Sequence, residues 1–124
     1  MNSININNLI QVGDETLAEL YKAKRMLEYT IEHPFKITTL KGIKKRKALE
    51  AQLLKTRLAV KVYSKKLEST SVEPLKSFAH MFLMDDMSAH LKTTEPEVML
   101  KEILWAINIV EHRQESLYQL VQDS

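Results

Sequence analysis

The sequence predicts an all-α protein, folded as an antiparallel bundle of about four helices in a single domain that spans residues 1–124. Three observations support this prediction. The chain holds only two glycines and three prolines, too few for the frequent turns of a β-sandwich or barrel. Leu, Lys, Glu, Ala and Met, which are good helix formers, are common in it. Its length suits one hydrophobic core and is too short for two ordinary domains.

The first helix is predicted over about residues 14–33. Asp14 can accept hydrogen bonds from the free amides of a first turn, and Pro34 ends the helix because the residue before proline avoids the α conformation. Gly13 interrupts the apolar spacing that precedes it. Residues 1–13 are therefore expected to form an N-terminal arm or the first turn of this helix.

The second helix, a long one, is predicted over about residues 38–67, and it carries two apolar stripes on opposite sides. A peripheral helix needs only one apolar face, so this helix is predicted to be central in its own bundle or shared with another chain. The first stripe is the candidate oligomer interface; it consists of Leu49, Leu53, Val60, Tyr63 and Leu67. The second stripe consists of Ala51, Leu54, Leu58 and Val62.

The third helix is predicted over about residues 72–91 and the fourth, also long, over about residues 95–122. Large apolar side chains surround most of the third helix, which predicts that it is well buried: Phe78, Met81, Phe82, Leu83, Met84 and Met87. The fourth helix begins at a capping box in residues 94–97. Its apolar side chains alternate at spacings of three and four, as in a coiled coil, with one polar interruption: Leu100, Ile103, Ile107, Val110, Gln114, Leu117 and Val121.

The charge is unevenly distributed. Residues 36–66 contain eleven basic side chains and one acidic side chain, whereas the rest of the chain contains seven basic and fifteen acidic ones. The basic segment can bind phosphate groups, or it can solvate the flanks of the second helix and pair with acids of the first and fourth helices. The candidate binding residues for nucleic acid or another partner are Lys41, Lys44, Lys45, Arg46, Lys47, Lys55, Arg57 and Lys61. The densest cluster, residues 41–47, lacks interleaved aromatic side chains that could stack on bases.

No catalytic, cofactor or metal-binding residue is predicted. Cysteine is absent, and the two isolated glycines cannot form a phosphate-binding loop. Asp86 and His90 share a helical face, but two ligands do not make a metal site. The chain is therefore predicted not to be an enzyme and to hold no cofactor.

Signals for export or membrane insertion are not evident. The N-terminal residues lack a basic region followed by an apolar run, and no apolar stretch has the length of about 18 residues that a membrane span requires. A cytoplasmic protein without a membrane partner is expected.

Part of the basic segment resembles a known family. Ile43-Lys44-Lys45, Leu49-Glu50-Ala51-Gln52, Arg57-Leu58 and Tyr63-Ser64 are similar to the basic helix of helical phage recombination mediators, which load recombinase onto single-stranded DNA. The resemblance covers residues 43–64 only, and no residue role is transferred through it. It implies an accessory factor that binds single-stranded nucleic acid.

Two functions follow as hypotheses. The first is a non-enzymatic protein-interaction module, such as an adaptor, chaperone-like or inhibitory protein. It would act by self-association, with a homodimer favoured, and by docking on a larger protein partner. The alternative is a single-stranded nucleic-acid-binding accessory factor, similar to a recombination mediator, that uses residues 36–66.

Overall fold

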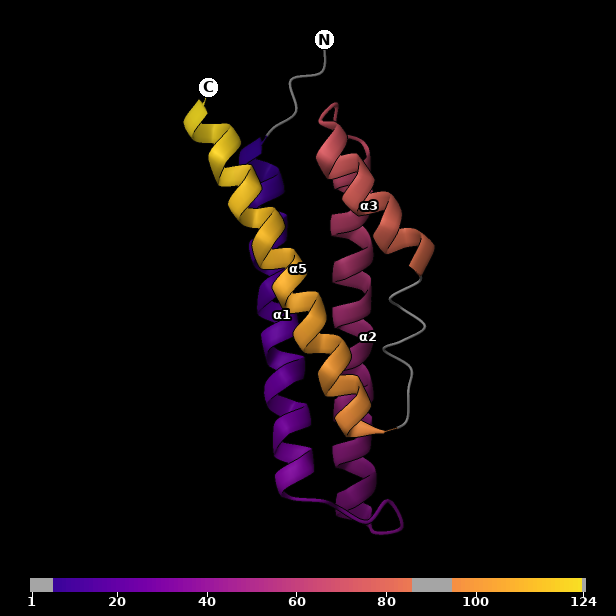
Figure 1. The fold of residues 1–124 in the computed structure, drawn as a ribbon. Coiled ribbons are helices and arrows are strands. Elements are labelled where there is room, and N and C mark those ends of the chain that lie inside the picture. Colours follow the sequence, from indigo (N-terminus) through magenta and orange to yellow (C-terminus); the bar gives the residue numbers. More distant parts are fainter. Residues whose placement is uncertain (1–5, 86–94, 124) are drawn as a thin grey trace.

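The fold is a helical bundle, seen in a computed structural model that describes residues 6–85 and 95–123. These residues form α1 (Ile6–Glu32), α2 (Leu40–Glu68), α3 (Glu73–Asp85) and α5 (Pro96–Asp123), with no strand among them. Figure 1 shows that consecutive helices run in opposite directions, and that α5 crosses α1. The main packing pairs are α1 with α5, α1 with α2, and α2 with α3. The predicted all-α antiparallel bundle is confirmed.

The first helix is longer than predicted. It begins at Ile6, so Asp14 lies inside the helix and is not its cap. Of the two alternatives for the N-terminal segment, residues 6–13 follow the second, because they belong to the helix and do not form an arm. The helix continues through Gly13 because this position is buried against α5. A Cβ atom on Gly13 would overlap the side-chain oxygen of Gln114. The glycine that the sequence suggested as a break is therefore a point of close helix packing.

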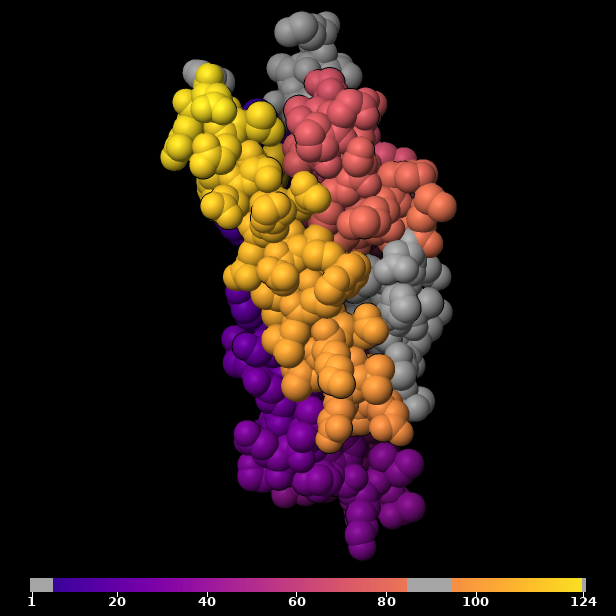
Figure 2. All heavy atoms as spheres, viewed as in Figure 1, coloured from indigo at the N-terminus to yellow at the C-terminus, as the bar shows by residue number. Residues whose placement is uncertain are grey.

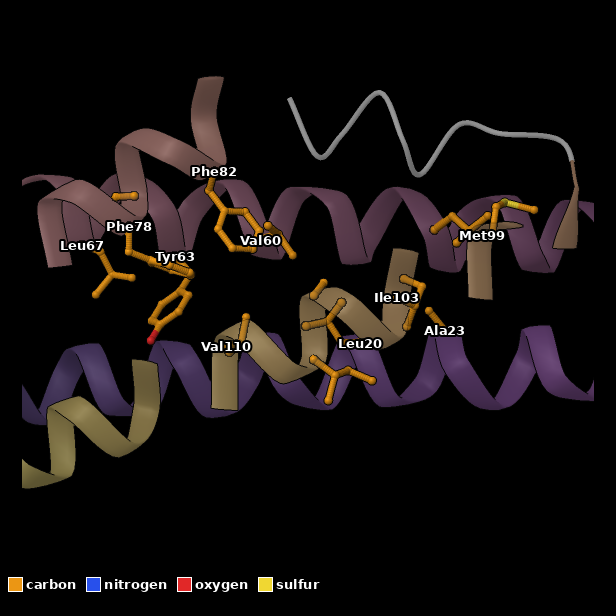
Figure 3. Packing of buried hydrophobic residues seen from close by; sticks show 14 of the residues in the cluster. Leu20, Ala23, Val60, Tyr63, Leu67, Phe78, Phe82, Met99, Ile103 and Val110 are labelled. Atoms are coloured by element: carbon orange, nitrogen blue, oxygen red, sulfur yellow. The ribbon is translucent and has the colours of Figure 1, made fainter. Parts of the chain in front are cut away.

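The second helix begins and ends close to the predicted bounds. The Oγ1 atom of its N-cap, Thr39, accepts a hydrogen bond from the amide of Gly42 at 3.0 Å. The first apolar stripe is buried inside the chain itself, so its assignment as an oligomer interface is wrong. Its members pack in the core of the bundle: Leu49, Leu53, Val60, Tyr63 and Leu67. Figure 3 shows Val60, Tyr63 and Leu67 in the space between the helices, together with Val110 and Leu20.

The third helix is only partly buried. Phe78 and Phe82 lie in the core, where their rings meet edge to face with centroids 4.7 Å apart. Met81 and Met84 are exposed, so the prediction of burial around most of the helix is wrong for them. Among the described helices α3 packs mainly on α2, and Met81 and Met84 lie outside that contact. The predicted C-terminal part of this helix, including Met87, lies outside the described residues.

The apolar seam of α5 lies on its buried side. Ile103, Val110 and Leu117 are fully buried, whereas Val121 at the C-terminal end is exposed. Gln114, the polar interruption, is also buried. With 27, 29 and 28 residues, α1, α2 and α5 make three long helices where two were predicted. Thr94, the proposed cap residue, lies outside the described residues.

In the two described ranges, no helix combines the length and the apolar character needed to cross a bilayer.

Candidate functional site

The positive charge of the chain is concentrated on one helix. α2 carries ten basic and two acidic side chains, a net charge of +8. α1 carries three basic and five acidic side chains, and α5 carries two and five, so their net charges are −2 and −3. One helix of the bundle is therefore strongly basic beside two acidic ones.

Within the described residues, no ion pair joins a basic side chain of α2 to the acidic helices α1 and α5. Among the described residues the one ion pair joins Arg46 Nε to Glu50 Oε1 at 2.9 Å, and both residues belong to α2. The interpretation that acids of α1 and α5 pair with this basic segment is thus wrong for the part of the chain that the structure describes.

The eight predicted binding residues do not form one patch. Lys44, Lys47, Lys55 and Lys61 are exposed on the side of α2 that faces away from the core. Lys41 is exposed in the first turn of α2, and Lys45 lies beside α1, with its Nζ 5.6 Å from the ring centre of Tyr29. Arg46 and Arg57 are half-buried, and Arg46 lines a hollow beside the N-terminus of α5. The basic residues are therefore spread over the exposed half of α2 and along both of its edges.

The second apolar stripe lies on the same exposed half. Leu54, Leu58 and Val62 are each about half exposed, at 46%, 52% and 49%. We call this surface the outward face of α2; it consists of Lys44, Lys47, Ala51, Leu54, Lys55, Leu58, Lys61, Val62 and Lys65. α5 and α3 cover α2 on the side that Figure 2 shows. Lys65 was not among the predicted binding residues, although its position places it on this face.

The end of the α1–α2 hairpin brings aromatic side chains to the basic cluster. A hollow of about 260 Å³ lies there, lined by Arg25, Met26, Tyr29, Thr30, Phe35, Lys45, Ala48 and Leu49. Tyr29 is 54% exposed, and the centre of its ring lies 4.7 Å from that of His33. The segment between the helices packs closely on α2, because a Cβ atom on Gly42 would overlap the carbonyl oxygen of Lys36. We call this region the hairpin-end hollow.

This juxtaposition was not predicted from the sequence. Residues 41–47 contain no aromatic residue, and the fold supplies Tyr29 from α1 and Phe35 from the connecting segment. Pro34 is a sequence signal for it, because this residue ends α1 and the next helix, α2, then runs antiparallel to α1. The last turns of α1 must then lie beside the first turns of α2.

A second hollow, of about 310 Å³, lies next to the first. The two share Thr30, Phe35 and Leu49. Glu95 and Glu97 line the second hollow together with Arg46. Two carboxylates make it a poorer site for an anion than the hairpin-end hollow.

The described residues show no arrangement typical of catalysis. No group of three or more potential metal ligands occurs among them, and Asp86 and His90 lie outside them. Burial raises the pKa of Tyr63 above its usual range, and a hydrogen bond to Glu111 raises that of Tyr21. A raised pKa makes a phenol a weaker source of phenolate, so neither tyrosine is activated as a nucleophile. The predictions of no catalytic residue, cofactor or metal remain predictions.

The chain was compared with protein-family models, curated proteins and solved structures, and no match was found in any of the three.

Proposed function

We propose that this chain is an accessory protein that binds single-stranded nucleic acid through the basic half of α2 and the hairpin-end hollow. The observation that carries the proposal is the juxtaposition of the basic cluster of α2, through Lys45, with the exposed ring of Tyr29. The resemblance of residues 43–64 to the basic helix of phage recombination mediators supports the same function. A cytoplasmic location, as expected from the sequence, is part of this proposal.

The electrostatic contribution comes from counterion release. Each phosphate that a Lys or Arg side chain contacts frees condensed cations, so a helix with a net charge of +8 attracts a polyanion at low salt. A single strand suits this surface better than a duplex does. Its bases are accessible to an aromatic side chain, whereas the bases of a duplex are stacked on each other.

Binding is tested by fluorescence anisotropy with a labelled single-stranded oligonucleotide at increasing salt. The logarithm of the affinity should fall with the logarithm of salt concentration, with a slope of about −0.7 per neutralised phosphate. Neutralising the basic cluster by Lys44→Gln, Lys45→Gln, Arg46→Gln and Lys47→Gln together should flatten the slope and weaken binding to all sequences alike.

The matched control removes the same number of charges elsewhere. Lys22→Gln, Lys24→Gln, Lys76→Gln and Lys101→Gln change α1, α3 and α5 and should leave the slope nearly unchanged. Attraction at low salt alone does not support the proposal, because any strongly basic surface attracts polyanions. Loss of binding by about 150 mM salt, or equal effects of the two quadruple variants, would refute it.

A protein-interaction module is the second candidate. It is favoured by one observation, the exposure of Leu54, Leu58 and Val62 on the outward face of α2, because phosphate binding does not need apolar side chains. Self-association or docking on a larger protein would cover them. This candidate is tested with Leu54→Ser and Leu58→Ser together. The double variant should abolish a protein contact while leaving oligonucleotide affinity within about twofold, since it removes no charge.

A further inference from the structure

Resting on the proposed function, we infer that the hairpin-end hollow binds one unstacked nucleobase. In this arrangement the base stacks on the ring of Tyr29, and Arg25 and Lys45 contact the phosphates on either side of it. The hollow would fix one nucleotide of the strand, while the rest of the basic surface holds the backbone without preference for sequence.

The size and lining of the hollow suit a flat, mostly apolar group. Its volume of about 260 Å³ lies just below the range of about 300–1,000 Å³ that is typical of sites for drug-sized ligands. Met26, Phe35, Ala48 and Leu49 provide apolar walls, and the hydroxyls of Tyr29 and Thr30 are the neutral polar groups of the lining. The Thr30 hydroxyl donates to the carbonyl oxygen of Met26 at 2.8 Å. With apolar walls and one of its two hydroxyls already donated to the backbone, the hollow can accept a base by its faces and offers few hydrogen-bonding groups for selecting among bases.

Tyr29 is placed to serve as the stacking platform. It lies near the C-terminal end of α1, on a regular helix, and 54% of its surface is exposed. Exposed aromatic rings on rigid elements bind with little loss of conformational freedom. The stacking of a base on such a ring is sequence-tolerant, because every base has a π face.

The cations of the hollow are placed at its rim. Lys45 Nζ lies 5.6 Å from the centre of the Tyr29 ring, within the range of a cation–π contact. Arg25 is exposed on the same helix as Tyr29. The long, flexible stem of Lys45 lets its ammonium group move from the ring to a phosphate when a base takes its place. A nucleotide thus satisfies the apolar walls and the cationic rim together.

The experiment separates base stacking from phosphate binding. Wild-type protein and Tyr29→Ala are titrated against an oligothymidylate and against an abasic strand with the same number of phosphates. Tyr29→Ala should weaken binding of the oligothymidylate at least fivefold, which corresponds to about 1 kcal/mol. It should leave binding of the abasic strand within about twofold and should not change the salt slope, since no phosphate contact is lost.

Further variants control for structure and for general aromatic effects. Tyr118→Ala is the matched control, because Tyr118 is 46% exposed on α5 and lines neither hollow. Tyr29→Phe and Tyr29→Trp should retain the preference for the strand that has bases. Tyr29→Leu keeps an apolar side chain without a π face and should lose the preference for the strand that has bases. Circular dichroism melting confirms that each variant is folded.

The possible results distinguish the inference from the proposed function. If Tyr29→Ala weakens both strands equally, or neither, while wild-type protein still binds near physiological ionic strength, the base site is wrong and nucleic-acid binding stands. If wild-type protein binds neither strand near physiological ionic strength, both are wrong. If Tyr29→Leu binds oligothymidylate as well as Tyr29→Phe does, the stacking role of the ring is wrong.

Discussion

At the scale of single residues, Gly13 shows how packing can reverse a local preference. In an isolated helix, alanine is favoured over glycine by about 1 kcal/mol. In this bundle, a Cβ atom at position 13 would overlap the Gln114 side chain. Gly13→Ala should therefore lower the free energy of unfolding by about 1–3 kcal/mol, measured by urea denaturation. In a Gln114→Ala background, Gly13→Ala should lower the free energy of unfolding by less. If Gly13→Ala alone raises the free energy of unfolding, the Gln114 side chain moves away from position 13 without loss.

Gln114 is itself buried and is the centre of a hydrogen-bond network. Its Oε1 accepts from the Tyr63 hydroxyl at 3.0 Å, and its Nε2 donates to the Ile10 carbonyl oxygen at 2.9 Å and to Asp14 Oδ1 at 2.8 Å. The amide thus joins α5 to α1 and α2. A polar residue satisfied in this way fixes the register of the helices, as a buried Asn does in a coiled coil.

The buried phenol of Tyr63 predicts a loss of stability at alkaline pH. Burial raises its pKa above the usual 10.0, so above pH 10 the unfolded chain loses this proton while the folded chain keeps it. The free energy of unfolding should then fall as pH rises, by up to about 1.4 kcal/mol per pH unit for this group. Denaturant titrations at pH 8 and about pH 11 check this sign.

Tyr63→Phe is the control for that pH dependence. It should cost about 1 kcal/mol at pH 8 through the lost hydrogen bond and should show a smaller alkaline loss than the wild type. Tyr21, whose pKa is also raised, is present in both proteins and cancels in the comparison. Equal alkaline losses in both proteins would mean that Tyr63 ionises in the folded state as readily as in the unfolded chain.

At the scale of elements, α2 has two apolar faces with different roles. Val60 is 4% exposed and packs in the core, whereas Leu58, two residues away, is 52% exposed. Val60→Glu should destabilise the fold by more than about 3 kcal/mol, because it buries an unpaired charge. Leu58→Glu should change stability by no more than about 0.5 kcal/mol. Thermal melts of both variants decide the assignment, and a folded Val60→Glu protein would contradict the burial of this stripe.

At the scale of the whole molecule, the segregation of charge affects association in two opposite ways. Nucleic-acid binding through α2 should weaken with salt. Antiparallel pairing of two outward faces, centred between Leu54 and Leu58, would place Lys47 of one copy opposite Lys65 of the other. Like charges at such a contact repel, so self-association through this face should strengthen as salt screens them.

Light scattering at low and high salt tests this expectation for the predicted homodimer. The average mass should rise with salt and protein concentration, and Leu54→Ser with Leu58→Ser should keep the protein monomeric. Tyr118→Ser, an exposed change on α5, is the control. If the average mass stays equal to the mass of one chain up to near-millimolar protein concentration, self-association is excluded. A dimer that weakens with salt would place the contact away from the outward face.

The sequence by itself determined the helical class, the bounds of α2 and the buried seam of α5. Apolar spacing and helix-end signals are local properties of the sequence. They predict the structure correctly where tertiary packing does not override them. The start of α2 close to residue 38 and the buried positions Ile103, Val110 and Leu117 are examples. The concentration of basic residues in α2 was also readable, because it depends on composition alone.

Only the tertiary structure decided which face of α2 is internal and where the basic cluster finds aromatic partners. The spacing of apolar residues does not show which of two similar stripes is buried, because burial depends on where α1, α3 and α5 pack. The same holds for Gly13, whose role depends on Gln114 in a distant helix. Tyr29 and Lys45 are separated by a helix end and a reversal of the chain, and they meet because antiparallel packing brings those turns together.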